Sequence, residues 1–184
     1  MKVIETGLPG LLIVEPSVFK DDRGYFFETF QQTRYQDAGI KTSFIQDNES
    51  KSVKGVVRGL HYQLGEFAQA KLVRVVQGKV FDVAVDLREN SPTFGKWFGL
   101  VLDDVDKKQL FIPRGFAHGF SVLSETAVFT YKCDNIYNRE SERSINPFDV
   151  QLAIDWKIEK ERAIVSEKDL KATAFEKAEM NFNI

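Results

Sequence analysis

Cysteine is nearly absent from this 184-residue sequence, whose one thiol is Cys133. A single cysteine excludes an intrachain disulfide, so the fold must depend on a hydrophobic core. No apolar stretch is long enough to cross a bilayer, and the opening MKVIETGLPG lacks the apolar core of a signal peptide. The formal net charge of -2 provides no basic surface for nucleic acid. We expect one cytoplasmic domain over residues 1–184 that binds neither nucleic acid nor membrane.

Short apolar segments separated by turn residues fill the middle of the chain. Lys71–Gln77 and Val80–Arg88 flank Gly78-Lys79, which predicts a hairpin, and residues 96–102 and 107–113 predict a second one. Further strands are expected at residues 11–15, 119–123 and 127–133. Helical patterns are confined to residues 33–39 and to a capping box at 166–169. This pattern predicts an all-β sandwich or barrel with a few short peripheral helices.

Histidine is also scarce, and its two positions fall in the frame of a known motif. His61 follows Gly55 after five residues, and His118 ends the run Pro113-Arg-Gly-Phe-Ala-His. This spacing resembles that of the cupins, whose fold is a jelly-roll barrel. Gln63 stands where a metal-binding cupin has its second histidine, and Lys71 stands where it has a glutamate. A lysine ammonium between two histidines repels a divalent cation but suits an enolate oxygen, so we expect no metal.

Longer segments extend the resemblance over nearly the whole chain. They include DDRGYFFETF, VVRGLHYQ, AQAKLVRVVQGKVFDVAVDLR, LFIPRGFAHGF and TYKCDNIY. In combination they resemble the dTDP-4-dehydrorhamnose 3,5-epimerase family. The resemblance implies a cupin jelly roll, a homodimer, no metal or organic cofactor, and a dTDP-sugar substrate. It also implies conversion of dTDP-4-dehydro-6-deoxy-D-glucose to dTDP-4-dehydro-L-rhamnose by proton exchange beside the C4 ketone.

The resemblance also implies catalytic roles for particular residues. His61 matches the base, Asp169 the acid that orients it, Lys71 the enolate stabiliser and Tyr131 the proton donor on the opposite sugar face. Strand alternation agrees for two of them, because Lys71 shares a face with valines and Tyr131 shares one with Phe129. Each also has a purely structural alternative: a helix cap for Asp169, a solvated strand end for Lys71 and a core position for Tyr131.

Other positions match substrate-binding residues of the family. They are Arg23, Phe26, Glu28, Gln46, Asp47, Asn48, Arg58, Gln63, His118, Tyr137, Glu142 and Lys168. Arginine's planar fork of donors suits a diphosphate, and Tyr137 is expected to stack on the thymine ring. We expect the segment that carries Arg23, Phe26 and Glu28 to complete the site of the partner subunit.

Two other functions remain open at the level of sequence. One is an epimerase that inverts only C3 or only C5 of another nucleotide deoxysugar. The other is a cupin that binds a nucleotide sugar without catalysis, although the retained His61, Lys71, Tyr131 and Asp169 argue against it.

Overall fold

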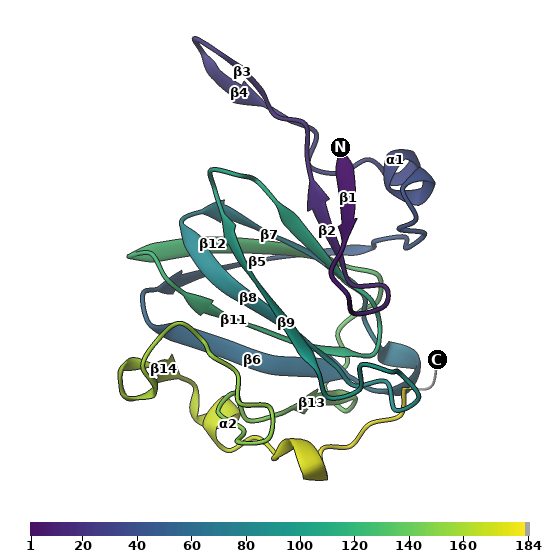
Figure 1. Cartoon of the computed structure of the whole chain (residues 1–184), viewed down its shortest axis with the longest axis vertical. Coiled ribbons are helices and arrows are strands. Elements are labelled where there is room, and N and C mark those ends of the chain that lie inside the picture. The colour runs from purple at the N-terminus through teal and green to yellow at the C-terminus, as the bar shows by residue number, and fades with distance from the viewer. Residues whose placement is uncertain (183–184) are drawn as a thin grey trace.

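The computed structural model describes residues 1–182, in which two sheets face each other across a shared core (Figure 1). The first, called here the β7 sheet, has the strand order β1 (Lys2–Glu5), β2 (Leu12–Glu15), β10 (Gln109–Ile112), β7 (Lys71–Gln77), β12 (Thr126–Cys133) and β5 (Gln46–Val53). The second, the β6 sheet, has the order β13 (Glu142–Ser144), β6 (Val56–Gln63), β11 (Phe116–Val122), β8 (Lys79–Asp86) and β9 (Trp97–Asp103). A short strand, β14 (Ile164–Val165), runs parallel to β6. The predicted all-β fold is confirmed.

Helical elements in the described chain are short. They are α1 (Gln32–Asp37), α2 (Glu167–Leu170) and 3₁₀ turns at Gly65–Phe67, Lys160–Arg162 and Phe175–Lys177. Both predicted helical segments are present, and Ser166 caps α2 by accepting a hydrogen bond from the amide of Asp169 at 3.1 Å. The reciprocal half of a capping box is not made, because the Asp169 carboxylate turns towards β6 instead. No helix among residues 1–182 is long and apolar enough to cross a membrane.

Both predicted hairpins are wrong, although their strands exist. β7 pairs with β10 and β12, whereas β8 pairs with β9 and β11. In the same way, β9 lies in the β6 sheet and β10 in the β7 sheet. Between β7 and β8 the chain turns a corner from one sheet to the other. At this corner Gly78 has φ +86°, and a Cβ there would collide with the carbonyl oxygen of Thr126. A tight glycine turn serves a hairpin or a corner between sheets equally well, and only the distant partner strands distinguish them.

The core lies in two layers on either side of the β6 sheet. Val80 and Ala84 of β8 point between the sheets and pack with Val73 of β7. Val83 and Val85 point the other way, into a cluster closed by residues of the C-terminal segment. β8 is therefore buried on both faces. Its polar residues on the Val80 face lie between the two sheets, in the interior of the barrel that these sheets form.

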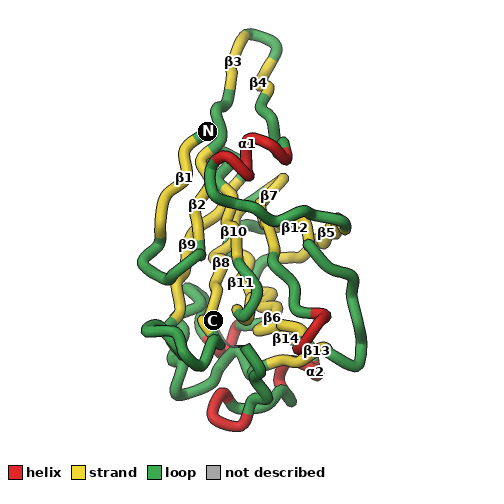
Figure 2. The backbone as a smooth tube through the Cα atoms, turned by 90° about the vertical axis from the view of Figure 1, so that its right-hand side faces the viewer, coloured by secondary structure: helices red, strands yellow, loops and turns green. Residues whose placement is uncertain are grey.

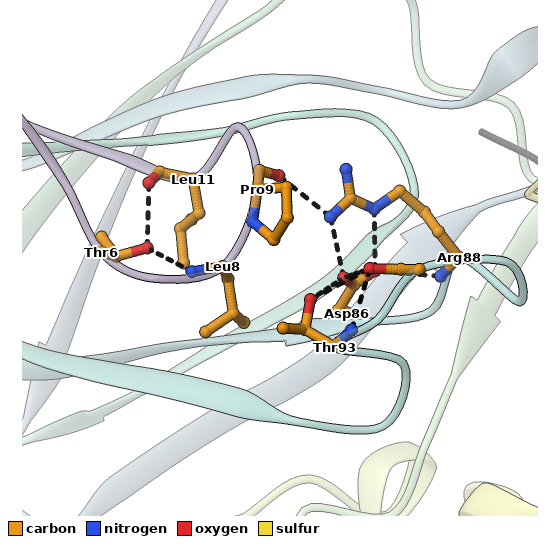
Figure 3. A network of polar contacts seen from close by, with 8 residues as sticks. Thr6, Leu8, Pro9, Leu11, Asp86, Arg88 and Thr93 are labelled. Atoms are coloured by element: carbon orange, nitrogen blue, oxygen red, sulfur yellow. Dashed lines mark hydrogen bonds and ion pairs between the residues drawn. The ribbon is translucent and has the colours of Figure 1, made fainter.

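The buried carboxylate of Asp86, at the end of β8, is linked to the N-terminal loop through Arg88 (Figure 3). Oδ2 of Asp86 accepts from Arg88 at 2.7 Å and from the hydroxyl of Thr93 at 2.6 Å. Arg88 also donates to the carbonyl oxygen of Pro9 at 2.9 Å. Burial raises the pKa of Asp86, but these hydrogen bonds outweigh it and hold the pKa below its ordinary value. Asp86 thus stays charged and joins three segments of the chain.

One ribbon extends away from the two sheets. β3 (Phe19–Asp21) pairs with β4 (Gly24–Phe26), and both views show it projecting from the body as an arm (Figures 1 and 2). Its aromatic side chains face solvent, with Phe19 65% and Phe26 71% exposed. Large exposed aromatic groups on a projecting ribbon are typical of a segment that packs against another surface.

Candidate active site

A cavity of ≈ 190 Å³ brings together many of the residues predicted from the sequence. Strands of both sheets and the loop before β13 supply its walls. It is lined by Gln46, Asn48, His61, Tyr62, Gln63, Gln69, Lys71, Tyr131, Tyr137 and Glu142. Of these, Tyr62 and Gln69 were not predicted from the sequence, in which an isolated tyrosine or glutamine carries no distinctive signal.

An irregularity in β6 allows Arg58 and His61 to face the same side. These residues are three apart, so strict strand alternation would place them on opposite faces. Opposite them on β11, however, Phe120 pairs with Arg58 and His118 pairs with His61, with a register shift between the two pairs. The extra residue on β6 restores a common orientation. Gly59 makes this possible, since it has φ +116° and a Cβ there would lie 2.6 Å from the Cα of Gly119.

His61 and Asp169 form a hydrogen-bonded pair. Nε2 of His61 lies 2.7 Å from Oδ1 of Asp169, and the amide of Gly59 donates to Oδ2 at 3.4 Å. Burial raises the pKa of Asp169, but the bonds from His61 and Gly59 prevail and keep its pKa below the ordinary value. An ionised carboxylate only accepts, so Nε2 of His61 carries a hydrogen and Nδ1 is free to accept a proton. The imidazole is 34% exposed and Asp169 is 6% exposed, so the histidine alone reaches the cavity.

Lys71 and Tyr131 lie beside each other on neighbouring strands of the β7 sheet. Nζ of Lys71 is 5.9 Å from the centre of the Tyr131 ring. Burial lowers the pKa of the Lys71 ammonium, while Cys133, Asp82 and Glu142 oppose that change. Burial also raises the pKa of the Tyr131 hydroxyl above its ordinary value, so it retains its proton at neutral pH. The cavity thus contains a lysine amine and a weak acid in addition to the imidazole.

Glu142 connects two more predicted residues. Its Oε2 accepts from Nζ of Lys168 at 2.5 Å and from the hydroxyl of Tyr137 at 3.1 Å. Burial raises the pKa of Glu142, but the bonds from Lys168 and Tyr137 outweigh it and the pKa is lowered. Glu142 and Tyr137 line the cavity on the side of β13, and Lys168 is bound to this pair through Glu142.

A second carboxylate–imidazole pair lies inside the barrel. Nε2 of His118 is 2.9 Å from Oδ2 of Asp82, and both side chains are buried. His118 sits directly opposite His61 in the β6–β11 pairing. Asp82 was not predicted as a site residue. Its signal was a carboxylate between Val80 and Ala84 on the inner face of a strand, where burial requires a partner.

Several predicted residues do not line this cavity. Strand alternation separates Asp47 from Gln46 and Asn48, and Asp47 pairs with Lys132 at 2.8 Å. Asp47 and Lys132 border an adjoining hollow of ≈ 320 Å³, which shares Asn48 and Tyr131 with the cavity but is lined by neither His61 nor Lys71. Arg58 is exposed near the cavity, where its charge lowers the pKa of Tyr131 against the effect of burial.

The three predicted residues of the N-terminal segment lie farther away. Arg23 is 90% exposed on the arm and pairs with Asp21 at 2.6 Å. Phe26 faces solvent, and Glu28 pairs with Arg34 at 3.2 Å. The arm and α2, whose Asp169 contacts His61, lie at opposite ends of the molecule (Figure 1). The chain therefore does not bring Arg23 and Phe26 of the arm to its own His61, and Glu28 is held by Arg34 of α1.

Gln63 lines the cavity but uses its amide for other contacts. Both hydrogens of Nε2 are donated to main-chain carbonyl oxygens, those of Phe67 at 2.7 Å and Ile136 at 3.1 Å. The predicted direct substrate contact is therefore not supported by its geometry. Within residues 1–182, no three His, Cys, Asp or Glu side chains are grouped so as to hold a metal ion.

Comparison with known proteins identifies the family. A family model described as dTDP-4-dehydrorhamnose 3,5-epimerase matches residues 5–177. A relative of that name from Shigella flexneri is 53% identical over 176 residues, which cover 95% of this chain and 96% of the relative. The chain belongs to the dTDP-4-dehydrorhamnose 3,5-epimerase family.

Solved structures agree with that family and with its cupin-like fold. The dTDP-6-deoxy-D-glucose-3,5-epimerase of Legionella pneumophila, in complex with dTDP-4-keto-L-rhamnose, is 50% identical with a TM-score of 0.91 and coverage of 96% of this chain and 93% of that one. ChmJ, a 3'-monoepimerase from Streptomyces bikiniensis in complex with dTDP-quinovose, is 31% identical with a TM-score of 0.84 and coverage of 91% and 85%. The fold is thus common to enzymes named for inversion of two centres and of one.

Proposed function

We propose that this chain converts dTDP-4-dehydro-6-deoxy-D-glucose to dTDP-4-dehydro-L-rhamnose by inverting C3 and C5, with His61 as the base. The observation that supports this assignment best is the arrangement of His61, Lys71 and Tyr131 around one cavity, with Asp169 behind the imidazole. The family membership and the similarity to relatives named for this reaction point to the same substrate.

The reaction uses the acidity of the carbons beside the C4 ketone. Nδ1 of His61 takes the proton from C3 or C5, and the C–H electron pair becomes the C–C double bond of an enolate whose charge lies on the C4 oxygen. The Lys71 ammonium faces that developing charge from within a partly buried site, where electrostatic stabilisation is strong. Tyr131 then gives a proton to the carbon from the opposite face and inverts the centre. Imidazolium and tyrosinate return to their starting forms by exchange with solvent.

Binding is assigned to groups around this centre. Arg58 suits the diphosphate, Glu142 and Lys168 suit polar groups of the nucleotide sugar, and the half-exposed ring of Tyr137 suits stacking on thymine. A sugar contact is assigned to His118, which is hydrogen-bonded to Asp82 and lies opposite His61 on β11.

Solvent deuterium tests the reaction directly. In D₂O the purified protein is expected to introduce deuterium at both C3 and C5 of the substrate, as followed by NMR, because each centre is deprotonated once per inversion. Label at C3 alone, or at C5 alone, would establish a single-centre epimerase in place of the double one. Binding of thymidine diphosphate with no label at either carbon would establish a nucleotide-sugar-binding protein.

We further propose that the enzyme works in the cytoplasm as a homodimer whose arms are exchanged. Its single, buried thiol fits a reducing compartment. The arm carries exposed Phe19, Arg23 and Phe26 away from the cavity of its own chain, as an arm that completes a neighbouring site would do. A two-fold dimer would place each arm at the partner's cavity reciprocally.

Mixing two inactive variants tests the exchange of arms. Arg23→Ala lacks the diphosphate contact and His61→Ala lacks the base, so each is expected to be deficient alone. If the arm acts in trans, a mixed dimer has one intact site, and random mixing should restore about a quarter of wild-type activity. If the arm acts in cis, no mixed dimer has an intact site and mixing restores nothing. Sedimentation of each variant checks that dimers form.

A further inference from the structure

Gln63 joins two loops that form one wall of the cavity. One loop, residues 64–70, follows β6, and the other, residues 134–141, follows β12. Nε2 of Gln63 donates to the carbonyl oxygens of Phe67 and Ile136, and Oε1 accepts from the amide of Asn138 at 2.7 Å. The side chain is only 5% exposed. Its hydrogen bonds are therefore made in a sheltered position, where leaving a polar group unpaired is costly.

The same two loops are joined at further points. Nδ2 of Asn135 donates to the carbonyl oxygen of Glu66 at 2.7 Å, and Nε2 of Gln69 donates to the carbonyl oxygen of Asn135 at 2.8 Å. The amide of Leu64 donates to the carbonyl oxygen of Ser141 at 2.9 Å. Hydrogen bonds from side-chain amides thus connect the two loops, which do not pair with each other as strands.

Tyr137 lies between the two main-chain groups that Gln63 holds in the second loop. The carbonyl of Ile136 precedes it and the amide of Asn138 follows it. The ring of Tyr137 lines the cavity and is 54% exposed, and its hydroxyl donates to Glu142. The backbone of an otherwise exposed aromatic residue is consequently fixed on both sides by one buried side chain.

We propose that Gln63 is a positioning residue that holds Tyr137 ready to stack on the nucleotide base without touching the substrate itself. This inference rests on the proposed function, in which Tyr137 contacts thymine. A loop already ordered before binding loses less conformational freedom when the ligand arrives, which strengthens affinity. Gln63 should therefore affect nucleotide binding and KM, whereas kcat should depend on His61, Lys71 and Tyr131.

Calorimetry with thymidine diphosphate on the Gln63→Leu variant tests this role. Kd for thymidine diphosphate and KM for the sugar nucleotide should rise about tenfold, with kcat little changed. Amide hydrogen exchange at Asn138 should accelerate, because its acceptor is lost. Asn135→Ala, at a partly buried position of the same loop pair, should produce a weaker change of the same kind and covers the case in which Gln63→Leu fails to fold. Ser121→Ala is the matched control. The Ser121 hydroxyl is also buried and donates to a main-chain carbonyl oxygen, that of Trp156 at 2.6 Å, but it lies outside the cavity.

A double-mutant cycle separates positioning from direct contact. In a Tyr137→Ala background, Gln63→Leu should produce no further loss of thymidine diphosphate affinity. Independent, additive losses would overturn the proposal, as would a fall in kcat at unchanged Kd. Binding of thymidine diphosphate is measured without turnover, so a wild-type protein that fails to epimerise would refute the proposed function and not the role of Gln63.

Discussion

Replacing His61 with alanine is expected to reduce the incorporation of solvent deuterium into the substrate by about 10³-fold, the size of effect typical of a lost general base. Nδ1 of His61 is the free proton acceptor in the cavity, because Nε2 is bound to Asp169 at 2.7 Å. Thymidine diphosphate should still bind, since the imidazole lies at the sugar end of the proposed complex. NMR of the substrate in D₂O measures the exchange, and calorimetry measures the binding.

Two further variants show whether this loss comes from the base. His61→Gln places an amide donor near the position of Nε2 and can still donate to Asp169, but it accepts no proton, so it should be as inactive as His61→Ala while protecting the buried carboxylate. Tyr131→Phe removes the acid and leaves the base, so proton removal should continue while inversion is impaired. Near-normal exchange in His61→Ala, or equal loss of exchange in Tyr131→Phe, would contradict the assignment.

Replacing Lys71 with methionine is expected to reduce kcat by about 10²- to 10³-fold, as loss of an oxyanion-stabilising group does in other enzymes. Methionine has similar length and no charge, so the change isolates the ammonium. Burial lowers the Lys71 pKa, and the reaction needs the charged form, so wild-type kcat should fall as pH rises through that lowered pKa. Steady-state kinetics across pH should show this decline in the wild type and not in Lys71→Met.

The control for Lys71→Met is a lysine that faces solvent on the other sheet. Lys79→Met, at the exposed start of β8, removes the same charge without touching the cavity and should retain wild-type kcat. If Lys71→Met instead raised KM at constant kcat, Lys71 would serve ground-state binding, and its role towards the enolate would be refuted.

Local patterns predicted the strands but not how they pair. Lys71–Gln77 was expected as a strand and is β7, and alternation correctly placed Lys71 on the inner face with Val73. The turn at Gly78 nevertheless leads to the opposite sheet and not to a hairpin partner. Alternation depends on neighbours in the chain, whereas pairing depends on which distant strand completes the hydrogen bonds of each edge.

In the site, too, local sequence patterns predicted individual residues, whereas contacts between residues far apart in the chain were not predicted from them. Spacing in the sequence placed His61 and His118 in a cupin frame, and Lys71 in place of a carboxylate argued against a metal ligand set. The contact between His61 and Asp169, which are 108 residues apart, came from family resemblance and is made in the structure. Nothing local predicted the Asp82–His118 pair or the use of Gln63 by the main chain.

By itself, the sequence determined the fold class, the inward faces of the strands and the kinds of chemical group available to the site. These properties follow from side-chain chemistry and from the two-residue period of a strand. The tertiary structure alone decided three other features: the crossing of β7 and β8 between sheets, the irregularity at Gly59 that turns Arg58 and His61 to one side, and the distance of the arm from its own cavity. Each depends on contacts between segments far apart in the chain, which no local pattern specifies.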